Sequence, residues 1–294
     1  MDGLVLVTGA TGTVGAPLVR ALVDDDVPVS AAVRNPPTAD LPAAAETVTF
    51  DFERPETWGF ALENVDRLFL LRPPTATRVG RHVIPFVAAA ARSGVEHCVV
   101  LSVLGAEKNP LLPHRRIEKA VAGSRMTYTF VRASFFMQNF LTTQREDICG
   151  HDELFVPAGD GATSFVDARD VAAVAAAALE NRVHVDCAYD VTGPVSLTYH
   201  EAADVFSDVL GREITYPSPS ALAFARRWRG RDASPGFVLA MVGIYTTARL
   251  GFASRVTDDV AHVLGREPRD LRTFVADHAA AFASAVGSVP CQQT

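Results

Sequence analysis

The sequence predicts an α/β fold, in which a doubly wound parallel sheet is joined to a smaller, mostly helical C-terminal lobe. Three observations lead to this fold class. Apolar runs typical of buried parallel strands alternate with helical patterns along the first half of the chain, and the connections between them are short. The first such strand leads through three glycines into a helix. The chain has 294 residues, 48% of them hydrophobic and 21% charged, so it can bury a large core.

Glycines organise the start of the chain. Residues 4–8 have an apolar strand pattern, and Gly9, Gly12 and Gly15 follow in the spacing G-x-x-G-x-x-G before a helical pattern begins. In such a turn the first glycine permits a tight bend. The second lets backbone N–H groups approach a pyrophosphate, and the third lets helix and strand pack closely. We therefore expect dinucleotide binding here, with a plain strand-to-helix connection as the alternative. The candidate contacts are Gly9, Thr11, Gly12, Thr13 and Val14.

The second strand pattern covers residues 27–34 and ends in Arg34. Sites that prefer NAD usually place an acidic residue about 20 residues beyond the glycines, where it binds the ribose hydroxyls. No acidic residue directly follows Val33, whereas the Arg34 guanidinium can pair with a 2′-phosphate. The sequence therefore favours NADP(H) as the cofactor, with NAD(H) as the alternative. A surface arginine that merely ends a strand would look the same.

Two further strand ends supply candidate cofactor contacts. The third strand pattern, residues 46–50, ends where the adenine of a dinucleotide would lie. The fourth, residues 67–71, runs into a pair of prolines, which mark a loop at the carboxyl end of a buried strand. Ligands of open α/β sheets bind beyond these ends. The residues assigned to the cofactor on this basis are Asp51, Phe52, Leu71, Arg72 and Pro73.

The alternation continues to the middle of the chain. A helix is expected from about Arg78 to Arg92, because Ser93 and Gly94 then signal its end. A fifth strand pattern follows over 95–102. The remaining elements expected here are a helix over 114–121, a sixth strand over 126–131 and a helix that residues 132–139 lead into.

Beyond Gly150 the composition changes. Short strands over 154–156 and 164–166 are expected to flank a turn at 159–161. After Thr198, which begins a capping box with Glu201, the pattern is mostly helical. The other expected elements are an alanine-rich helix from 167–170, a strand over 188–192, and helices from 217–219, over 237–250 and over 269–286. The predicted domains are 1–152 together with 167–193, and 194–294 together with 153–166.

Charge and composition exclude several classes of protein. The net charge of −7 repels nucleic acid, and no apolar run approaches the about 18 residues of a membrane span. The four cysteines are scattered, so neither a metal site nor a disulfide framework is indicated. The first strand begins within three residues of the N-terminus and leaves no room for a signal peptide. We therefore expect a cytoplasmic protein that binds a small molecule.

An ordered set of motifs spans the chain from about Leu4 to about Phe282. The motifs are residues 8–15, 33–36, Asp51, Ser102, His114 with Glu118, residues 135–139, 165–170, 192–194 and 263–268. In this set the chain is similar to NmrA-like atypical short-chain dehydrogenases/reductases, especially the NAD(P)H:quinone oxidoreductase and isoflavone-reductase-like branches. The resemblance implies a Rossmann domain that binds NAD(P)H and a small C-terminal lobe that shapes the substrate pocket.

The Tyr-x-x-x-Lys pair of typical short-chain dehydrogenases is missing. The only lysines are Lys108 and Lys119, and neither has a tyrosine four residues before it. The resemblance places His114 at the tyrosine position, with Glu118 one helical turn later. His114 can donate a proton near neutral pH, and Glu118 can orient its ring. Ser102, at a strand end, can bond a carbonyl. The alternatives are a His114 that caps its helix and a Ser102 that is an ordinary turn residue.

Without that pair, the acceptor should be one that disperses negative charge. A quinone or a conjugated enone spreads the charge over its π system, so it needs mainly proximity to the nicotinamide and exclusion of water. The expected substrate is therefore a flat aromatic or quinone compound, which includes aromatic polyketide intermediates of secondary metabolism. Its candidate contacts are Phe136, Asn139 and Tyr245, each of which could instead be a core residue.

Two other functions use the same features. A regulator that senses NAD(P) without turning it over would also lack the Tyr-Lys pair. A sugar-nucleotide epimerase is disfavoured because its chemistry uses that pair. A homodimer is compatible with the sequence, which does not define the oligomeric state.

Overall fold

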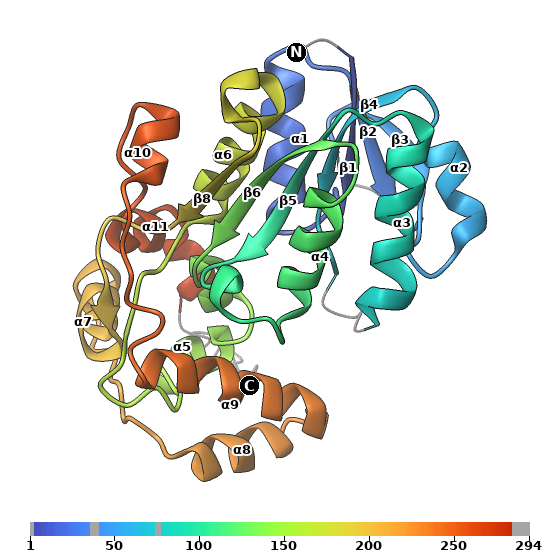
Figure 1. Ribbon diagram of the computed structural model, residues 1–294. Helices are drawn as coiled ribbons and strands as arrows, with labels where there is room; N and C mark the ends of the chain where they lie inside the picture. Colours follow the sequence, from blue (N-terminus) through green and yellow to red (C-terminus); the bar gives the residue numbers. More distant parts are fainter. Residues whose placement is uncertain (1–2, 36–40, 74–77, 284–294) are drawn as a thin grey trace, which may run out of the picture. The chain divides into compact units, whose positions relative to one another are not determined.

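The computed structural model describes residues 3–35, 41–73 and 78–283, which form two compact units (Figure 1). The first unit comprises Met1–Ala133, Ala168–Val191 and Asp259–Glu267. The second comprises Ser134–Asp167, Thr192–Asp258 and Pro268–Thr294. These units differ from the predicted domains because residues 134–152, 167 and 192–193 cluster with the second unit and residues 259–267 with the first.

The first unit is built on a seven-stranded parallel sheet with the strand order β3-β2-β1-β4-β5-β6-β8. The strand order reverses between β1 and β4, and in such doubly wound sheets the carboxyl ends of the strands at this switch point form the ligand crevice. The strands are β1 (Leu4–Thr8), β2 (Val29–Val33), β3 (Glu46–Thr49), β4 (Val65–Leu70), β5 (His97–Val103), β6 (Thr127–Ala133) and β8 (Cys187–Val191). The predicted α/β fold class is confirmed.

Helices cover both faces of this sheet, which explains why β1 and β2 read as continuous apolar runs. The helices α1 and α6 pack against each other, with α10 beside α6, and α3 packs against α4 and α2 (Figure 1). Gly94 ends α3 with a φ of 102°, as its sequence predicted. The helices are α1 (Gly15–Asp24), α2 (Trp58–Ala61), α3 (Val79–Ser93), α4 (Pro113–Ala122), α6 (Ala168–Glu180) and α10 (Asp259–Leu264), with 3-10 turns at Pro55–Thr57, Ala106–Lys108 and Arg182–His184.

The second unit is mostly helical, around an aromatic core that includes Phe140, Phe165 and Tyr199. The predicted capping box is present, since the Thr198 hydroxyl accepts from the Glu201 N–H and the Glu201 carboxylate accepts from the Thr198 N–H. The elements are a 3-10 turn at Met137–Leu141, α5 (Arg145–His151), β7 (Ala162–Thr163), β9 (Leu197–Thr198), α7 (Tyr199–Leu210), α8 (Ala221–Arg229), α9 (Pro235–Arg249), α11 (Leu271–Asp277) and a 3-10 turn at Ala279–Phe282.

The two short strands expected around residues 159–161 do not pair with each other. The strand β7 pairs antiparallel with β9, which is 35 residues later in the chain. Near the first expected strand, Glu153 forms a bridge with Thr215, and in the second Val166 forms a bridge with Phe136. The prediction of strands over 154–156 and 164–166 is wrong, since only isolated bridges form there and their partners lie elsewhere in the sequence.

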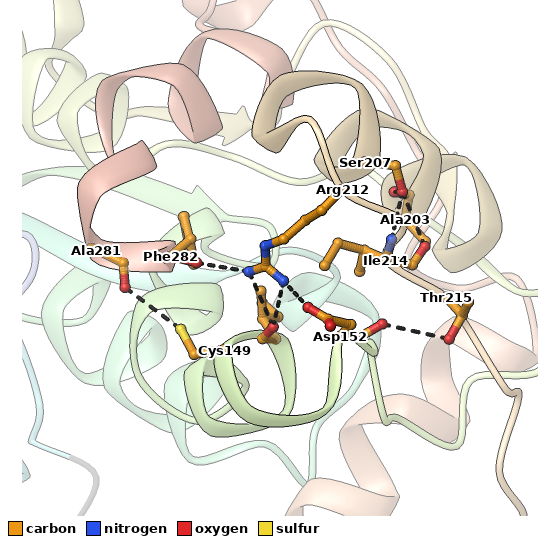
Figure 2. Close-up of polar contacts among 10 residues, drawn as sticks. Cys149, Asp152, Ala203, Ser207, Arg212, Ile214, Thr215, Ala281 and Phe282 are labelled. Atoms are coloured by element: carbon orange, nitrogen blue, oxygen red, sulfur yellow. Dashed lines mark hydrogen bonds and ion pairs between the residues drawn. The ribbon is translucent and has the colours of Figure 1, made fainter. Parts of the chain in front are cut away.

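One arginine joins three segments of the second unit (Figure 2). Arg212 follows Gly211, the left-handed residue that ends α7. Its guanidinium donates to the Phe282 carbonyl at 2.7 Å and to the Ile148 carbonyl at 3.3 Å, and it also pairs with the Asp152 carboxylate. The end of α5, the start of the chain after α7 and the last 3-10 turn are therefore held together by one cation.

Candidate active site

The glycine turn after β1 has the backbone that only glycine accommodates easily. Gly9 has a φ of +66°, in the left-handed region. A Cβ on Gly15 would lie 2.1 Å from the Gly9 carbonyl oxygen, so a side chain there would push helix and turn apart. The Gly12 N–H closes the turn by donating to the same oxygen at 2.9 Å. The two constraints, tight bend and close packing, are those expected of a dinucleotide-binding turn.

The N-terminus of α1 is open to an anion. No side chain caps it and its first turn holds no acidic residue. Thr11, Gly12 and Thr13 are exposed, whereas Val14 is 2% exposed and can contact a ligand only through its backbone. Helix N-termini attract phosphate because their N–H groups lack intrahelical acceptors. These residues therefore fit the pyrophosphate of a dinucleotide.

Arg34 directly follows β2, at the carboxyl edge of the sheet. Its side chain is exposed, and it makes no ion pair or hydrogen bond with any residue in the described part of the chain. Residues 36–40, which follow, lie outside that part. An unpaired guanidinium at the end of the second strand is suited to a 2′-phosphate.

The next two candidates, Asp51 and Phe52, serve mainly the fold. The Asp51 carboxylate accepts from the Glu53 N–H at 2.9 Å and so shapes the loop after β3. The Phe52 ring is buried and meets Phe50 and Phe86 edge-on at 4.8 and 5.4 Å. The Phe52 ring therefore belongs to the core, so only its backbone is available to the adenine, and Phe52 stays a prediction as a cofactor contact. The second carboxylate oxygen of Asp51 is not used by that loop bond.

Thr8 places the end of β4 beside the glycine turn. Its buried hydroxyl donates to the Phe69 carbonyl at 3.0 Å and accepts from the Leu71 N–H at 2.8 Å. Leu71 contacts the turn directly, since a Cβ on Gly9 would lie 2.9 Å from the Leu71 Cδ2 atom. Leu71 and the half-buried Arg72 and Pro73 therefore border the cradle at the switch point of the sheet.

A buried carboxylate lies at the carboxyl ends of β5 and β6. Glu118 of α4 is 0% exposed and accepts from Ser102 Oγ at 2.7 Å, Arg132 Nε at 2.9 Å and Arg115 Nη1 at 3.1 Å. These hydrogen bonds, Arg132 foremost, outweigh burial and lower the pKa of Glu118, so the carboxylate is ionised at neutral pH. Arg132 also approaches Glu107 at 3.6 Å. One carboxylate thus binds α4 to two strand ends.

Ser102 cannot act as the sequence suggested without giving up this bond. Its hydroxyl proton is donated to Glu118, and the side chain is 2% exposed. A serine hydroxyl has one proton, so it has none left for a substrate carbonyl. We therefore assign Ser102 to the support of α4.

His114 lies in the first turn of α4, which begins at Pro113. Its ring is half-buried, and Nδ1 has no hydrogen-bond partner among the described residues. Glu118 does not orient the ring, contrary to expectation, because its oxygens are used by Ser102, Arg115 and Arg132. Burial and the nearby Arg72 guanidinium lower the pKa of His114 to about 4, so at pH 7 it is a neutral imidazole and not a proton-donating imidazolium.

Tyr128 and Tyr245 each have an arginine four residues later, the nearest arrangement to a Tyr-x-x-x-Lys pair, and both tyrosines serve the core. Tyr128 stacks on Phe130 with 4.4 Å between ring centroids, and Arg132 is held by Glu118. In the second unit, Tyr245 is 1% exposed and its hydroxyl accepts from Gln144 Nε2 at 2.9 Å. Burial raises the pKa of the Tyr245 phenol well above its usual range. The expectation that Tyr245 contacts substrate is wrong, because it is a core residue.

The other substrate candidates are better placed for contact. Phe136 is half-buried and its backbone forms the bridge with Val166. Asn139 is half-buried too, and its backbone carbonyl accepts from the Thr142 and Gln144 N–H groups. No described residue hydrogen-bonds the Asn139 side-chain amide. Both residues stay predictions as substrate contacts in the second unit.

Sequence reasoning missed Arg132 as part of this site. Arg132 and Ser102 are directly opposite each other in the β5–β6 register. Two features of the sequence could have indicated it. A polar residue stands at the carboxyl end of each of two strands, and the helix between these strands has a glutamate on its apolar face. That pattern indicates a buried ion pair, since a buried carboxylate needs a cationic partner.

A family model and several known proteins match this chain over most of its length. The model of the NmrA-like family matches residues 1–225. An NAD(P)H azoreductase of Xenophilus azovorans is 34% identical, over 96% of this chain and all of the relative. A (4-alkanoyl-5-oxo-2,5-dihydrofuran-3-yl)methyl phosphate reductase of Streptomyces griseus is also 34% identical, over 95% of this chain and 99% of the relative.

An Escherichia coli protein is similar in both sequence and structure comparisons. Quinone oxidoreductase 2 of that organism is 29% identical, over 76% of this chain and 80% of the relative. The crystal structure of NADPH-dependent quinone oxidoreductase from E. coli, complexed with NADPH, matches with a TM-score of 0.84 at 24% identity, over 93% of this chain and 99% of that chain. The fold is therefore shared across this set.

Proposed function

The chain belongs to the NmrA-like family, and from that premise we propose that it is an NADPH-dependent reductase of flat conjugated carbonyl compounds. That it is an NAD(P)H-dependent oxidoreductase follows from the full-length similarity to reductases of this family. The acceptor is the proposed part: a quinone, or an enone of the aromatic polyketide type. No Tyr-Lys pair takes part.

The residues of the first unit fit the cofactor. The glycine turn bends and packs as only glycine allows, no side chain caps the N-terminus of α1, and Arg34 has no hydrogen-bond or ion-pair partner among the described residues. When bound, NADPH supplies the hydride. The backbone N–H groups of Thr13 and Val14 would hold the pyrophosphate, Gly12 would leave room for it, and Arg34 would hold the 2′-phosphate.

The observation that carries the acceptor class is His114. Its Nδ1 atom is buried without a partner in the described residues, beside the cradle-bordering Arg72, and its ring is neutral. A neutral imidazole N–H donates a hydrogen bond but is a very weak acid. It can therefore polarise the oxygen of an acceptor that already disperses charge, and it suits an isolated ketone poorly because that acceptor becomes an alkoxide.

The named substrates of relatives support the same acceptor class. The S. griseus relative is named for a 5-oxo-2,5-dihydrofuran, in which a ring carbonyl is conjugated with a carbon–carbon double bond. The E. coli relative is named for quinones and the X. azovorans relative for azo compounds. All three acceptors are conjugated, and none is a simple alcohol or sugar.

The test is NADPH consumption by the purified protein against quinones, polycyclic enones and azo dyes, followed by absorbance. We expect turnover with at least one flat conjugated acceptor and none with simple ketones. Gly12→Val is the control. Its side chain fills the space in which the pyrophosphate would bind and leaves the rest of the fold unchanged, so it should abolish both cofactor binding and turnover.

A regulator that binds NADP(H) without turnover is the competing function, favoured by the missing Tyr-Lys pair. It predicts tight NADPH binding that Gly12→Val abolishes, with no acceptor-dependent oxidation across the whole panel. Binding without turnover would therefore replace the reductase proposal by the regulator.

A further inference from the structure

Residues 217–257 of the second unit combine apolar and basic side chains in an otherwise acidic protein. The stretch contains six arginines and a single acidic residue, Asp232, whereas the whole chain has a net charge of −7. It forms α8, α9 and the turn after them, and α8 and α9 pack against each other (Figure 1). The local charge is thus opposite to that of the whole molecule.

The helix α9 exposes a face without charge. Its buried face is Val238, Met241, Tyr245 and Ala248. The exposed residues of the rest of the helix are Gly236, Leu239, Ala240, Gly243, Ile244, Thr246 and Thr247 together with its two ends. No charged residue occurs between Asp232 and Arg249, and Leu239 is 74% exposed. A solvent-facing helix side is normally polar or charged, so this one indicates an interaction surface.

Large apolar side chains extend the surface beyond α9. Leu250 and Phe252 follow the helix, with Phe252 75% exposed, and Gly251 between them turns the chain at a φ of +78°. Leu222 is also exposed, at the start of α8. Side chains that project from a helix end and a tight turn can enter the boundary region of a bilayer.

Three arginines of this stretch are available to a partner. Arg226, Arg229 and Arg249 are exposed, and their guanidinium groups form no hydrogen bond or ion pair within the described ranges. In contrast, Arg227 and Arg231 are used internally, because both bind the Asp147 carboxylate of α5. The free cations therefore accompany the exposed apolar residues and not the core.

We propose that this α8–α9 surface, with the turn through Phe252, docks the protein on a bilayer that contains anionic lipids. Exposed apolar side chains together with unpaired arginines are the chemistry of an interfacial helix. A second copy fits less well, since a symmetric contact would bring the arginines of both copies together. In the described residues no helix is long and apolar enough to cross a bilayer, so the contact is peripheral.

The test is flotation of the purified full-length protein with vesicles of phosphatidylcholine alone or of equal parts phosphatidylcholine and phosphatidylglycerol. We expect binding only to the anionic vesicles, weaker at high salt. Phe252→Ser should lower the partition coefficient at least about 10-fold through lost apolar burial. The double variant Arg226→Ser, Arg229→Ser should lower the partition coefficient about 30-fold, because each substitution removes the attraction of one cation to the anionic lipids.

Matched controls come from the first unit. Phe60 is exposed to the same 75% as Phe252, and Arg20 and Arg81 are exposed arginines. Phe60→Ser and the Arg20→Ser, Arg81→Ser pair should leave vesicle binding unchanged, and circular dichroism checks that every variant is folded.

Three results would overturn the proposal: no binding of the wild-type protein to anionic vesicles, equal losses in the control variants, or a dimer in light scattering that Leu239→Ser dissociates. The last result would assign the surface to a second copy. Because flotation needs neither cofactor nor acceptor, its failure would leave the reductase proposal intact.

Discussion

Ser102 and Arg132 lie opposite each other on β5 and β6, and both hydrogen-bond the same buried carboxylate, that of Glu118 on α4. The helix that carries His114 is thus fastened to the carboxyl ends of two neighbouring strands. In a doubly wound sheet this edge forms the ligand site. The support of the site and the stability of the fold therefore depend on one ion cluster.

Glu118→Gln should destabilise the protein and weaken turnover more than cofactor binding. The change leaves the Arg132 cation partly buried without its carboxylate, which costs about 3 kcal/mol for a buried pair. Denaturant unfolding measures the stability loss, and the Kd for NADPH should stay within about threefold of wild type. Glu56→Gln is the control, because the Glu56–Arg54 pair is exposed to solvent and contributes little to stability. Equal losses in both variants would contradict a buried role.

Acid should destabilise the first unit through His97. This residue of β5 is 2% exposed, and its ring nitrogens bond Thr127 at 2.9 Å and Thr129 at 3.2 Å. Burial lowers the pKa of His97 to about 4, although Asp186 raises it. Between about pH 6.5 and 4 the unfolded chain therefore binds a proton that the folded chain does not, so stability falls as pH falls.

The loss from His97 should amount to at most about 1.4 kcal/mol per pH unit, the limit for one proton. Urea unfolding at stepped pH measures this slope, and His97→Gln should reduce it. His151→Gln, at an exposed histidine of α5, is the matched substitution against which the effect of His97→Gln is compared. A slope that survives His97→Gln would assign the acid sensitivity to other groups.

The sheet was predictable because its determinants are local. Each determinant lies within a few residues of the feature it specifies. These determinants are the apolar runs of the buried strands, the glycines after Thr8 and Gly94 at the end of its helix. The pairing of β7 with β9 was not predictable, because nothing near residues 159–161 encodes a partner 35 residues away. A tight turn only permits a hairpin, whereas tertiary packing decides it.

The candidate site was predictable, like the sheet, only where its determinants are local. The glycine turn and Arg34 could be proposed from the sequence because the backbone and charge requirements of a phosphate are visible in residue type. Tyr245 was misassigned and the Phe52 ring is in the core, since an aromatic residue on an apolar helix or at a strand end fits the core and a ligand equally well. The Glu118 cluster could not be predicted, because it depends on the register that places Ser102 opposite Arg132, and only the folded sheet shows this register.

Arg34→Ala should weaken binding of NADP(H) about 10-fold or more while changing NAD(H) binding little. A charge-assisted hydrogen bond contributes about 1.5–3 kcal/mol, and only NADP(H) has the 2′-phosphate that accepts it. Isothermal titration with both cofactors measures the two dissociation constants. Arg81→Ala, at another exposed arginine of the first unit, should change neither. Equal losses for the two cofactors would refute the 2′-phosphate assignment.

His114→Ala should lower kcat for a conjugated acceptor about 10-fold, by removing one neutral hydrogen bond to the acceptor oxygen, and leave the Kd for NADPH unchanged. Because the pKa of His114 is about 4, wild-type kcat should show no titration of this residue between about pH 5.5 and 8. Arg72→Met removes the nearby positive charge, so it should raise the His114 pKa, which NMR titration of the ring measures. His114→Gln retains a neutral N–H donor and should recover part of the lost rate. Full activity in His114→Ala, or a kcat that follows a group with pKa near 6.5 and disappears with His114, would show that the ring does not act as a neutral donor.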